Sequence, residues 1–365
     1  MKGNINKLSI EEKVGQMLMV GMNTSNVKEK VKKFILEYKV GGIILYKKNY
    51  KNYKELIELV NYIKDLNCVN KTPLWIAIDQ EGGRVNRLPK DFENLPSANK
   101  LSNYEKEDLV EKAGNITGRI LNKVGVNFNF APVLDVKRFE DNHAIGDRAF
   151  SDDIDKVTKY GVEYMKELQK QKVVSVIKHF PGHGATNKDT HYFLPKIKKS
   201  IKKLQKEDMK PFVQAIEEGA DALLVSHLRI NRGAGYLPTS MSRKFITKFI
   251  RKKYRFKGLI VTDDLRMRSV KNLYGKNKPI IKAFGAGNDI IVFKYNSENE
   301  KVIDKLVESV RNNKLIEARV NRSVNRILKM KEKYNISNEK IEVDENFINN
   351  INKEIMYIKN KIKGE

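Results

Sequence analysis

The chain has little of several features that define common protein classes. One cysteine, Cys68, among 365 residues excludes an intramolecular disulfide and a zinc site built from several cysteines. No segment approaches the roughly 20 apolar residues of a membrane-spanning helix, and 32% of the residues are charged. The N-terminal segment lacks the apolar stretch of about 7–15 residues that a secretory signal needs. We therefore expect a cytoplasmic protein that starts naturally at Met1.

Acidic residues are scarce relative to basic ones, with 45 Asp and Glu against 71 Lys and Arg, which gives a net charge of +26. Such an excess attracts phosphates, nucleic acids or anionic surfaces. Most of it is lysine, spread singly, in pairs and in short runs such as Arg251-Lys252-Lys253. This pattern favours a solvated basic surface over a nucleic-acid site, since clustered arginines and aromatic stacking platforms are absent. We expect neither a nucleic acid nor a membrane as partner.

Hydrophobic residues make up 40% of the chain, enough for a sizeable core, and eight short apolar runs recur along it. They are rich in Val, Ile and Leu without strict alternation, as in parallel strands buried on both faces. Segments with helical spacing separate them. The pattern predicts an α/β fold, a single (β/α)₈ barrel of the TIM type, with a doubly wound open sheet as the alternative. The runs are Met17–Val20, Gly42–Leu45, Leu74–Ile78, Val126–Pro132, Val173–Ile177, Ala222–Val225, Gly258–Val261 and Asp289–Phe293.

Helix signals lie between the runs. Ser9 followed by Glu12 predicts a capping box ahead of the first run. The helix that contains Phe212 is predicted to stop at Gly219. We see no linker that would divide the chain. We expect residues 1–335 to form the catalytic barrel and residues 336–365 to form a C-terminal helical extension.

Ionisable residues follow five consecutive runs at the end where a barrel of this type carries its active site. Any one of these residues could simply cap a neighbouring helix. Ionisable residues after five strands in succession, however, favour a functional site. These residues are Asp79, Asp135, Lys178, His179, His227, Asp263 and Asp264.

The segment from Lys178 to His191 holds three of the five histidines in a turn rich in glycine. A histidine two residues from a carboxylate, as His191 is from Asp189, can hydrogen-bond to it, which fixes the imidazole tautomer and suits proton transfer near neutral pH. A metal site is the alternative that we disfavour, because His179, His183 and His191 lack the i, i+4 pairing of helical zinc ligands and no cysteine supports them.

Two further segments offer carboxylates and arginines. Asp263 follows an apolar run and is equally suited to be a nucleophile or a structural cap. The segment 78–87 places paired glycines between carboxylates and arginines, so its backbone can approach a small polar ligand, and Arg87 can donate to hydroxyl-rich or acidic groups. An Arg–Asp network at the barrel mouth is the alternative, which fits Arg84 or Glu81 better than Asp79. Gly146–Phe150 adds Arg148 on a turn.

Together these motifs resemble family 3 glycoside hydrolases, specifically the bacterial β-N-acetylhexosaminidase branch related to exo-acting enzymes of peptidoglycan recycling. The motif KHFPGHG-x₄-D-x-H is the most specific, and it separates this branch from relatives that carry a glutamate acid/base in a second domain. The strings spread over nearly the whole chain. They are VGQMLMVG, GGIILYKKNY, IAIDQEGGRVNRL, NFNFAPVLDV, GDRAF, KHFPGHG, DTH, LPTSMS and VTDDLRM.

The resemblance implies a role for individual residues. Asp263 matches the catalytic nucleophile, His191 the general acid/base and Asp189 its partner. The residues that match ligands of the hydroxyls of a terminal N-acetylglucosamine are Asp79, Arg87, Arg148, Lys178 and His179. The resemblance also implies the barrel fold, retention through a covalent glycosyl–Asp intermediate, and no metal or organic cofactor. The expected partner is a small carbohydrate, namely an N-acetylglucosaminyl muropeptide or cell-wall disaccharide, acted on by a monomer.

Small departures from the family pattern bear on the leaving group. Tyr46 stands where phenylalanine is frequent, and Arg266 and Arg268 flank the nucleophile where smaller or acidic residues are commoner. A neutral imidazole base does not repel an incoming anion as a carboxylate would, so a phosphorylase that uses phosphate as acceptor is one alternative. A family 3 β-glucosidase and a catalytically silent sugar-binding relative are others. The sequence does not select the natural aglycone.

Overall fold

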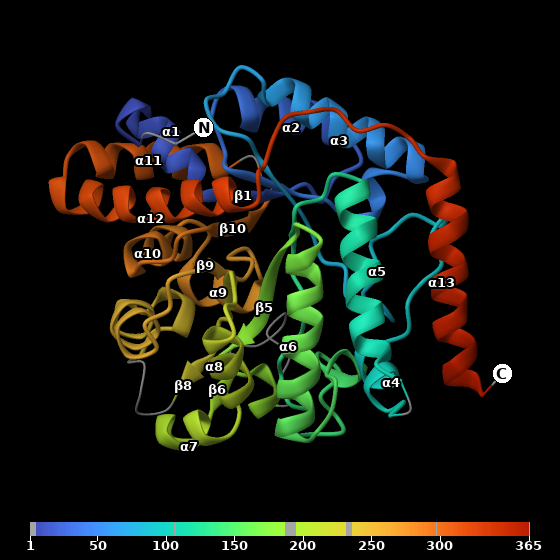
Figure 1. Ribbon diagram of the computed structural model, residues 1–365. Helices are drawn as coiled ribbons and strands as arrows, with labels where there is room; N and C mark the ends of the chain where they lie inside the picture. The colour runs from blue at the N-terminus through green and yellow to red at the C-terminus, as the bar shows by residue number, and fades with distance from the viewer. Residues whose placement is uncertain (1–4, 106, 187–194, 231–235, 297, 365) are drawn as a thin grey trace.

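The computed structural model describes residues 5–105, 107–186, 195–230, 236–296 and 298–364, and its centre is a sheet of eight parallel strands (Figure 1). Every predicted apolar run contributes one of them, and the strands are almost entirely buried. In spatial order they are β10 (Ile291–Lys294), β1 (Leu18–Gly21), β2 (Gly42–Ile44), β3 (Trp75–Ile78), β4 (Phe128–Asn129), β5 (Val174–Phe180), β7 (Ala222–Val225) and β9 (Leu259–Thr262).

The sheet curls until its two ends meet. β1 pairs with both β2 and β10, so the first and last strands of the chain are neighbours. A parallel bridge between Val261 and Ile290, with a hydrogen bond of 3.0 Å from the Thr262 N–H to the Ile290 carbonyl, joins β9 to β10. The predicted (β/α)₈ barrel is thereby confirmed, and the alternative of an open doubly wound sheet is wrong.

Helices surround the barrel (Figure 1). The predicted Ser9–Glu12 capping box is present, and Gly219 follows α8 with a φ of +91°. Among the described residues, no helix combines the length and apolarity needed to cross a bilayer. The helices are α1 (Ile10–Gln16), α2 (Val27–Leu36), α3 (Tyr53–Asn67), α4 (Ala98–Ser102), α5 (Leu109–Lys123), α6 (Ile154–Lys170), α7 (Ile201–Lys206), α8 (Lys210–Glu217), α9 (Arg268–Tyr274), α10 (Lys278–Ala286), α11 (Asn299–Arg311), α12 (Lys314–Lys333) and α13 (Glu345–Lys363).

Shorter elements complete the structure. Lys244–Lys253 forms a π-helical segment, η6, and β6 (Lys196–Ile197) pairs with β8 (Arg229–Ile230) in a small second sheet. The 3₁₀ turns are η1 (Ile5–Lys7), η2 (Lys47–Asn49), η3 (Gly146–Arg148), η4 (His183–Ala185) and η5 (Thr239–Met241).

Helix α12 closes the barrel where the strands begin. The buried ammonium of Lys331 donates to Gln16 Oε1, at the end of α1, and to the carbonyls of Gly41 and Pro73, just before β2 and β3. Three donors meet three acceptors there. At this end of the barrel, the Lys331 ammonium therefore finds all its hydrogen-bond partners within the protein.

The C-terminal helix lies along the outside of the barrel. α13 runs beside α5 (Figure 1), and Arg119 on α5 forms a bidentate pair with Glu354 on α13, at 2.7 and 3.0 Å. Ile351, Ile355 and Ile358 bury the inner face of α13. This helix therefore packs on the barrel surface, away from the ends of the strands.

Candidate active site

A cavity of about 340 Å³ opens at the carboxyl ends of the strands. Its walls carry side chains from the ends of β3, β5, β9 and β10 and from the loop before η3, which is where a parallel barrel gathers ligand-binding groups. The polar and charged residues that line it are Tyr46, Asp79, Glu81, Arg84, Arg87, His143, Arg148, Lys178, His179, His183, Thr262, Asp263, Asp264 and Lys294.

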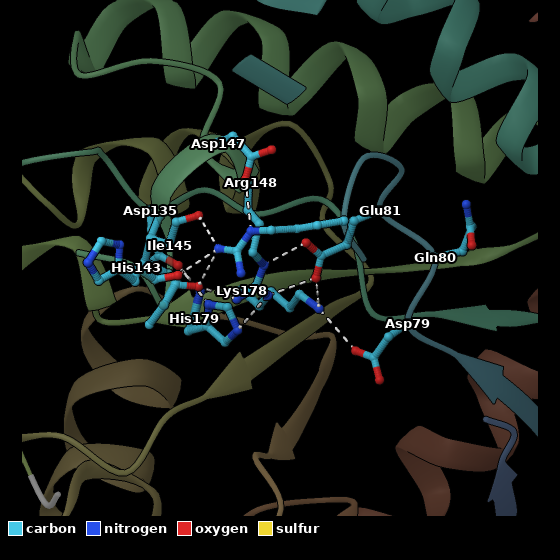
Figure 2. A network of polar contacts seen from close by, with 12 residues as sticks. Asp79, Gln80, Glu81, Asp135, His143, Ile145, Asp147, Arg148, Lys178 and His179 are labelled. Carbon is cyan, nitrogen blue, oxygen red and sulfur yellow. Dashed lines mark hydrogen bonds and ion pairs between the residues drawn. The ribbon is translucent and has the colours of Figure 1, made fainter. Parts of the chain in front are cut away.

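Glu81 is the carboxylate that joins two cations of this cavity (Figure 2). It accepts from the Arg148 guanidinium through both oxygens, at 2.8 Å each, and lies 2.6 Å from Lys178 Nζ. Burial alone would raise the pKa of the Glu81 carboxyl, but Arg148 and Lys178 outweigh burial and lower that pKa well below its usual range. Glu81 is therefore a fixed negative charge that holds both cations in position.

Lys178 also reaches the cavity wall opposite Arg148. Its ammonium lies 3.0 Å from Asp79 Oδ1, and the Asp79 side chain is 30% exposed, so its other oxygen can meet a ligand. Gln80 points away from this network (Figure 2), because its Oε1 accepts from the backbone N–H groups of Arg87 and Leu88. Those bonds fix the turn that carries Arg87 into the cavity.

Arg87 differs from the other cations in its partners. Within the described part of the chain, its guanidinium forms no hydrogen bond or ion pair. An unpaired guanidinium in a polar cavity has five N–H donors to offer to hydroxyl or acidic groups.

Asp135 is a wholly buried carboxylate that organises the histidines. It accepts from His179 Nδ1 at 2.6 Å and from the His183 backbone N–H at 2.5 Å. Since Nδ1 carries the proton that is donated to Asp135, His179 presents Nε2 on the side of Arg148, 3.5 Å from that guanidinium. Burial opposes ionisation of Asp135, but the adjacent histidines lower its pKa, so the anchor of His179 stays charged.

His183 lies beside His179 in the same wall, with ring centroids 5.9 Å apart. Its side chain is buried, and this burial lowers its pKa to about 4 despite the nearby Asp135 carboxylate. His183 is therefore neutral at physiological pH.

Arg84 holds the loop that leads into η3. Its guanidinium donates to the carbonyls of His143 and Ile145, at 2.8 and 3.0 Å, and to Asp147 Oδ1 at 2.8 Å. The predicted alternative of an arginine–carboxylate network at the barrel mouth is thus confirmed for Arg84 and for Glu81. Arg84 fixes the backbone immediately before Arg148.

Asp263 directly follows β9 and lines the cavity. Its backbone N–H donates to the Val225 carbonyl at 3.1 Å, and its Oδ1 accepts from the Asp264 N–H at 2.8 Å. The neighbouring Asp264 is turned to the loop, where it accepts from the backbone N–H groups of Arg266 and Lys294 and pairs with Lys294 Nζ at 3.2 Å. Both carboxylates line the cavity, but Asp264 is engaged by Arg266 and Lys294 and so holds the loop.

His227, two residues after β7, contacts the same loop. Its Nε2 donates to the Asp264 carbonyl at 3.1 Å, so its Nδ1 accepts from the Ser240 hydroxyl at 2.7 Å. Burial lowers the pKa of His227, which keeps the ring neutral and this tautomer in place.

The structure brings together six of the eight predicted site residues: Asp79, Arg87, Arg148, Lys178, His179 and Asp263. Asp189 and His191 lie outside the described residues. Asp135 and His227 belong to the predicted series of ionisable residues that follow the strands, but neither they nor Glu81 were assigned a role as an anchor. Their partners lie far away in the sequence, so spacing alone does not reveal the pairs.

Residues 9–330 match the family described as "Glycosyl hydrolase family 3 N terminal domain". Two curated relatives extend the match. The chain is 31% identical over 324 residues to Beta-hexosaminidase A of Pseudoalteromonas piscicida, covering 82% of this chain and 54% of that protein. It is 32% identical over 281 residues to a Beta-hexosaminidase of Hydrogenovibrio crunogenus, covering 75% and 77%. The chain thus spans about half of the first relative and most of the second.

A solved structure agrees with these relatives. The glycoside hydrolase family 3 beta-N-acetylglucosaminidase from Paenibacillus sp. str. FPU-7 superposes with a TM-score of 0.89 at 30% identity, over 97% of this chain and 69% of that one.

Proposed function

Because the chain belongs to glycosyl hydrolase family 3, we propose that it is a retaining exo-β-N-acetylglucosaminidase that removes a terminal N-acetylglucosamine from cell-wall fragments. The observation that carries the proposal is the position of Asp263 in one cavity with the network of Asp79, Lys178 and Glu81. The names of the relatives, beta-hexosaminidase and beta-N-acetylglucosaminidase, support the sugar.

The cavity suits one sugar ring. At about 340 Å³ it lies near the lower limit of ligand sites, which span roughly 300–1,000 Å³. Asp79 can accept hydrogen bonds from hydroxyls, while Arg87 and Arg148 can donate to them. A small cavity with both donors and acceptors supports exo action on a terminal residue.

The proposed reaction is a double displacement. A carboxylate oxygen of Asp263 attacks the anomeric carbon as the glycosidic bond breaks, and the protonated His191 gives its proton to the leaving oxygen. His191, now neutral, then takes a proton from water, which attacks the anomeric carbon and releases Asp263. Asp189 would hold the imidazole in the tautomer that these proton transfers need.

Three further statements belong to the proposal. The natural substrate would be a muropeptide or a cell-wall disaccharide, which the resemblance to peptidoglycan-recycling enzymes supports. The protein would act as a cytoplasmic monomer. Residues 1–335 would be the catalytic unit, with 336–365 as its helical extension.

A comparison of chromogenic substrates tests which sugar the enzyme removes. We expect p-nitrophenyl N-acetyl-β-glucosaminide to be cleaved at least about 100-fold faster than the plain β-glucoside, since a site built for a polar group rejects the analogue that lacks it. NMR should show the β-anomer as the first product. A faster glucosidase reaction, or the α-anomer first, would contradict the proposal. Sugar phosphate formed in millimolar phosphate would favour a phosphorylase.

Replacing His191 with Ala tests its proposed role as the general acid. We expect turnover of a disaccharide, which has a poor leaving group, to fall by roughly 10²–10⁴-fold. The p-nitrophenyl glycoside should lose less in its glycosylation step, measured as the pre-steady-state burst, because nitrophenolate needs little protonation. An equal loss on both substrates would count against the acid role.

A further inference from the structure

The segment that contains η6 concentrates positive charge on the outside of the barrel. Eight of the 15 residues from 243 to 257 are Lys or Arg and none is Asp or Glu, whereas basic residues make up 71 of 365 in the whole chain. Seven of these eight cations are exposed, and Arg243 is the one that precedes η6. The other six form what we call the basic face: Lys244, Lys248, Lys252, Lys253, Arg255 and Lys257.

The segment that displays this face is held firmly by its other side chains. Phe245, Ile246 and Ile250 are buried in the core. Arg251 turns inward, pairs with Asp289, and donates to the carbonyls of Phe256 and Gly258 at 2.7 and 2.6 Å. The apolar side of η6 is therefore committed to the barrel, and only the charged side faces solvent.

The cations of the basic face lack the partners that other lysines have. On α2, Lys30 pairs with Glu29 at 2.7 Å and Lys33 with Glu300 at 2.8 Å. None of the six cations of the basic face forms an ion pair with any residue that the structure describes. Among the residues that the structure describes, no carboxylate is paired with these cations to offset their mutual repulsion.

Helix α7 extends the same surface. Gln205 on α7 donates to the Tyr254 hydroxyl, just after η6, at 3.1 Å. The exposed residues of α7 are again lysines: Lys202, Lys203 and Lys206. α7 therefore contacts the residue after η6, and both elements carry exposed lysines, of which Lys203 pairs with Glu207 at 3.8 Å.

The aromatic rings near this surface are not free to stack on nucleic-acid bases. Phe249 is stacked on Phe245, with centroids 5.2 Å apart at an angle of 16°. Lys253 Nζ lies 5.3 Å from the centroid of Phe249, and the Tyr254 ring meets Phe249 edge-on. Binding to single strands depends on such free ring faces, so phosphate recognition by charge alone is what this surface offers.

We propose that the basic face of η6, with α7, is a peripheral contact surface for an anionic lipid bilayer. Clustered Lys and Arg on the outside of a helix are attracted to the phosphate plane of acidic lipids, and no apolar side chain of η6 needs to insert. The contact is electrostatic, and it is independent of the proposed glycosidase activity. This proposal differs from the expectation of no membrane partner, which rested on the scattered pattern of the lysines and on the lack of a spanning segment. A contact held by surface charge needs no spanning segment.

Co-sedimentation with vesicles tests the proposal. The intact protein is mixed with vesicles of neutral phosphatidylcholine alone, or of equal parts phosphatidylcholine and anionic phosphatidylglycerol. We expect binding only to the anionic vesicles at about 50 mM NaCl, and its loss at about 500 mM, where the Debye length is only a few ångströms.

Two charge-reversal variants with the same net charge locate the contact. K244E/K248E/K252E alters the basic face, while K301E/K305E/K314E alters exposed lysines on α11 and α12. We expect the first variant to bind anionic vesicles about tenfold or more weakly and the second to stay within about twofold of the parent. Unchanged glycosidase activity and unfolding midpoint show that each variant is folded.

Three results would overturn the proposal. They are no binding of the parent to anionic vesicles, an equal loss in both variants, and tighter binding of the parent to a DNA duplex than to vesicles in the same buffer. The last result, if K244E/K248E/K252E abolished it, would assign the face to nucleic acid instead.

Discussion

The two ends of the barrel both bury charged groups, but they use them differently. Where the strands begin, Asp289 accepts from Arg251, Arg326 and the Ile260 N–H, and α12 covers the cluster. Where the strands end, Glu81 and Asp135 also hold cations and histidines, yet those groups surround an open cavity.

The two ends differ in whether their buried polar groups keep hydrogen-bonding capacity for a ligand. At the closed end, Lys331 has three protein acceptors for its three hydrogens. At the open end, Arg87 has no such partner among the described residues and the Asp79 side chain is partly exposed. Buried groups whose hydrogen bonds are all made within the protein serve the fold, whereas polar groups held beside a cavity can meet a ligand. Substitutions at the two ends should therefore separate activity from stability.

The largest expected effect is at the open end. Asp263→Asn should lower kcat by about 10⁴-fold or more, because an amide cannot form the glycosyl–enzyme. The free energy of unfolding should change by less than about 1 kcal/mol, since Asp263 borders the cavity. Steady-state rates and urea unfolding measure the two effects. A variant that keeps normal turnover removes Asp263 as the nucleophile.

The closed end should show the reverse. Asp289→Asn leaves Arg251 and Arg326 without their carboxylate and should lower the free energy of unfolding by about 3–5 kcal/mol. The folded fraction should keep its KM, because Asp289 lies at the opposite end of the barrel from the cavity. Urea unfolding and active-site titration give the two quantities. A raised KM with unchanged stability would mean that the two ends are not separate.

A smaller effect should appear with pH at the open end. Burial lowers the pKa of His183 to about 4 in the folded protein, against about 6.5 in the unfolded chain. The unfolded chain therefore binds this proton first as the pH falls, and stability is lost between pH 6.5 and 4. From pH 7 to pH 5 we expect a loss of about 2 kcal/mol from His183.

His183→Gln isolates that contribution. The variant should lose less free energy of unfolding than the parent between pH 7 and pH 5, as urea titrations at both pH values would show. His227, whose pKa burial also lowers, contributes in the same direction and remains in both proteins. Identical pH slopes for variant and parent would show that His183 does not titrate abnormally.

Much of the barrel could be predicted because each strand is a continuous apolar run buried on both faces. The weakest case is the predicted run 126–132, of which only Phe128–Asn129 is strand. There a side chain makes hydrogen bonds that the backbone makes between regular strands. Asn129 Oδ1 accepts from the Gln80 N–H at 2.9 Å, and Asn129 Nδ2 donates to the Gln80 carbonyl. A local pattern cannot anticipate such bonds to a distant turn.

The candidate site was predictable only in part. The strand ends and the family motifs point to Asp79, Lys178, His179 and Asp263, because a barrel gathers at one end the residues that come directly after its strands. The residues that hold these side chains in position were harder to predict. Glu81 stands among glycines in a turn, and only folding brings Arg148 and Lys178 to its two oxygens.

The pairing of β1 with β10 has a consequence for how this protein is made. The first strand pairs with β2 early but cannot find its second partner until residues 291–294 have been synthesised, and Lys331 must be added before it can donate to the carbonyls of Gly41 and Pro73. A chain emerging from the ribosome therefore carries an unclosed sheet with an unpaired strand edge for most of its synthesis. Such edges invite aggregation, so production of this protein should depend on how quickly the nascent chain is completed or shielded.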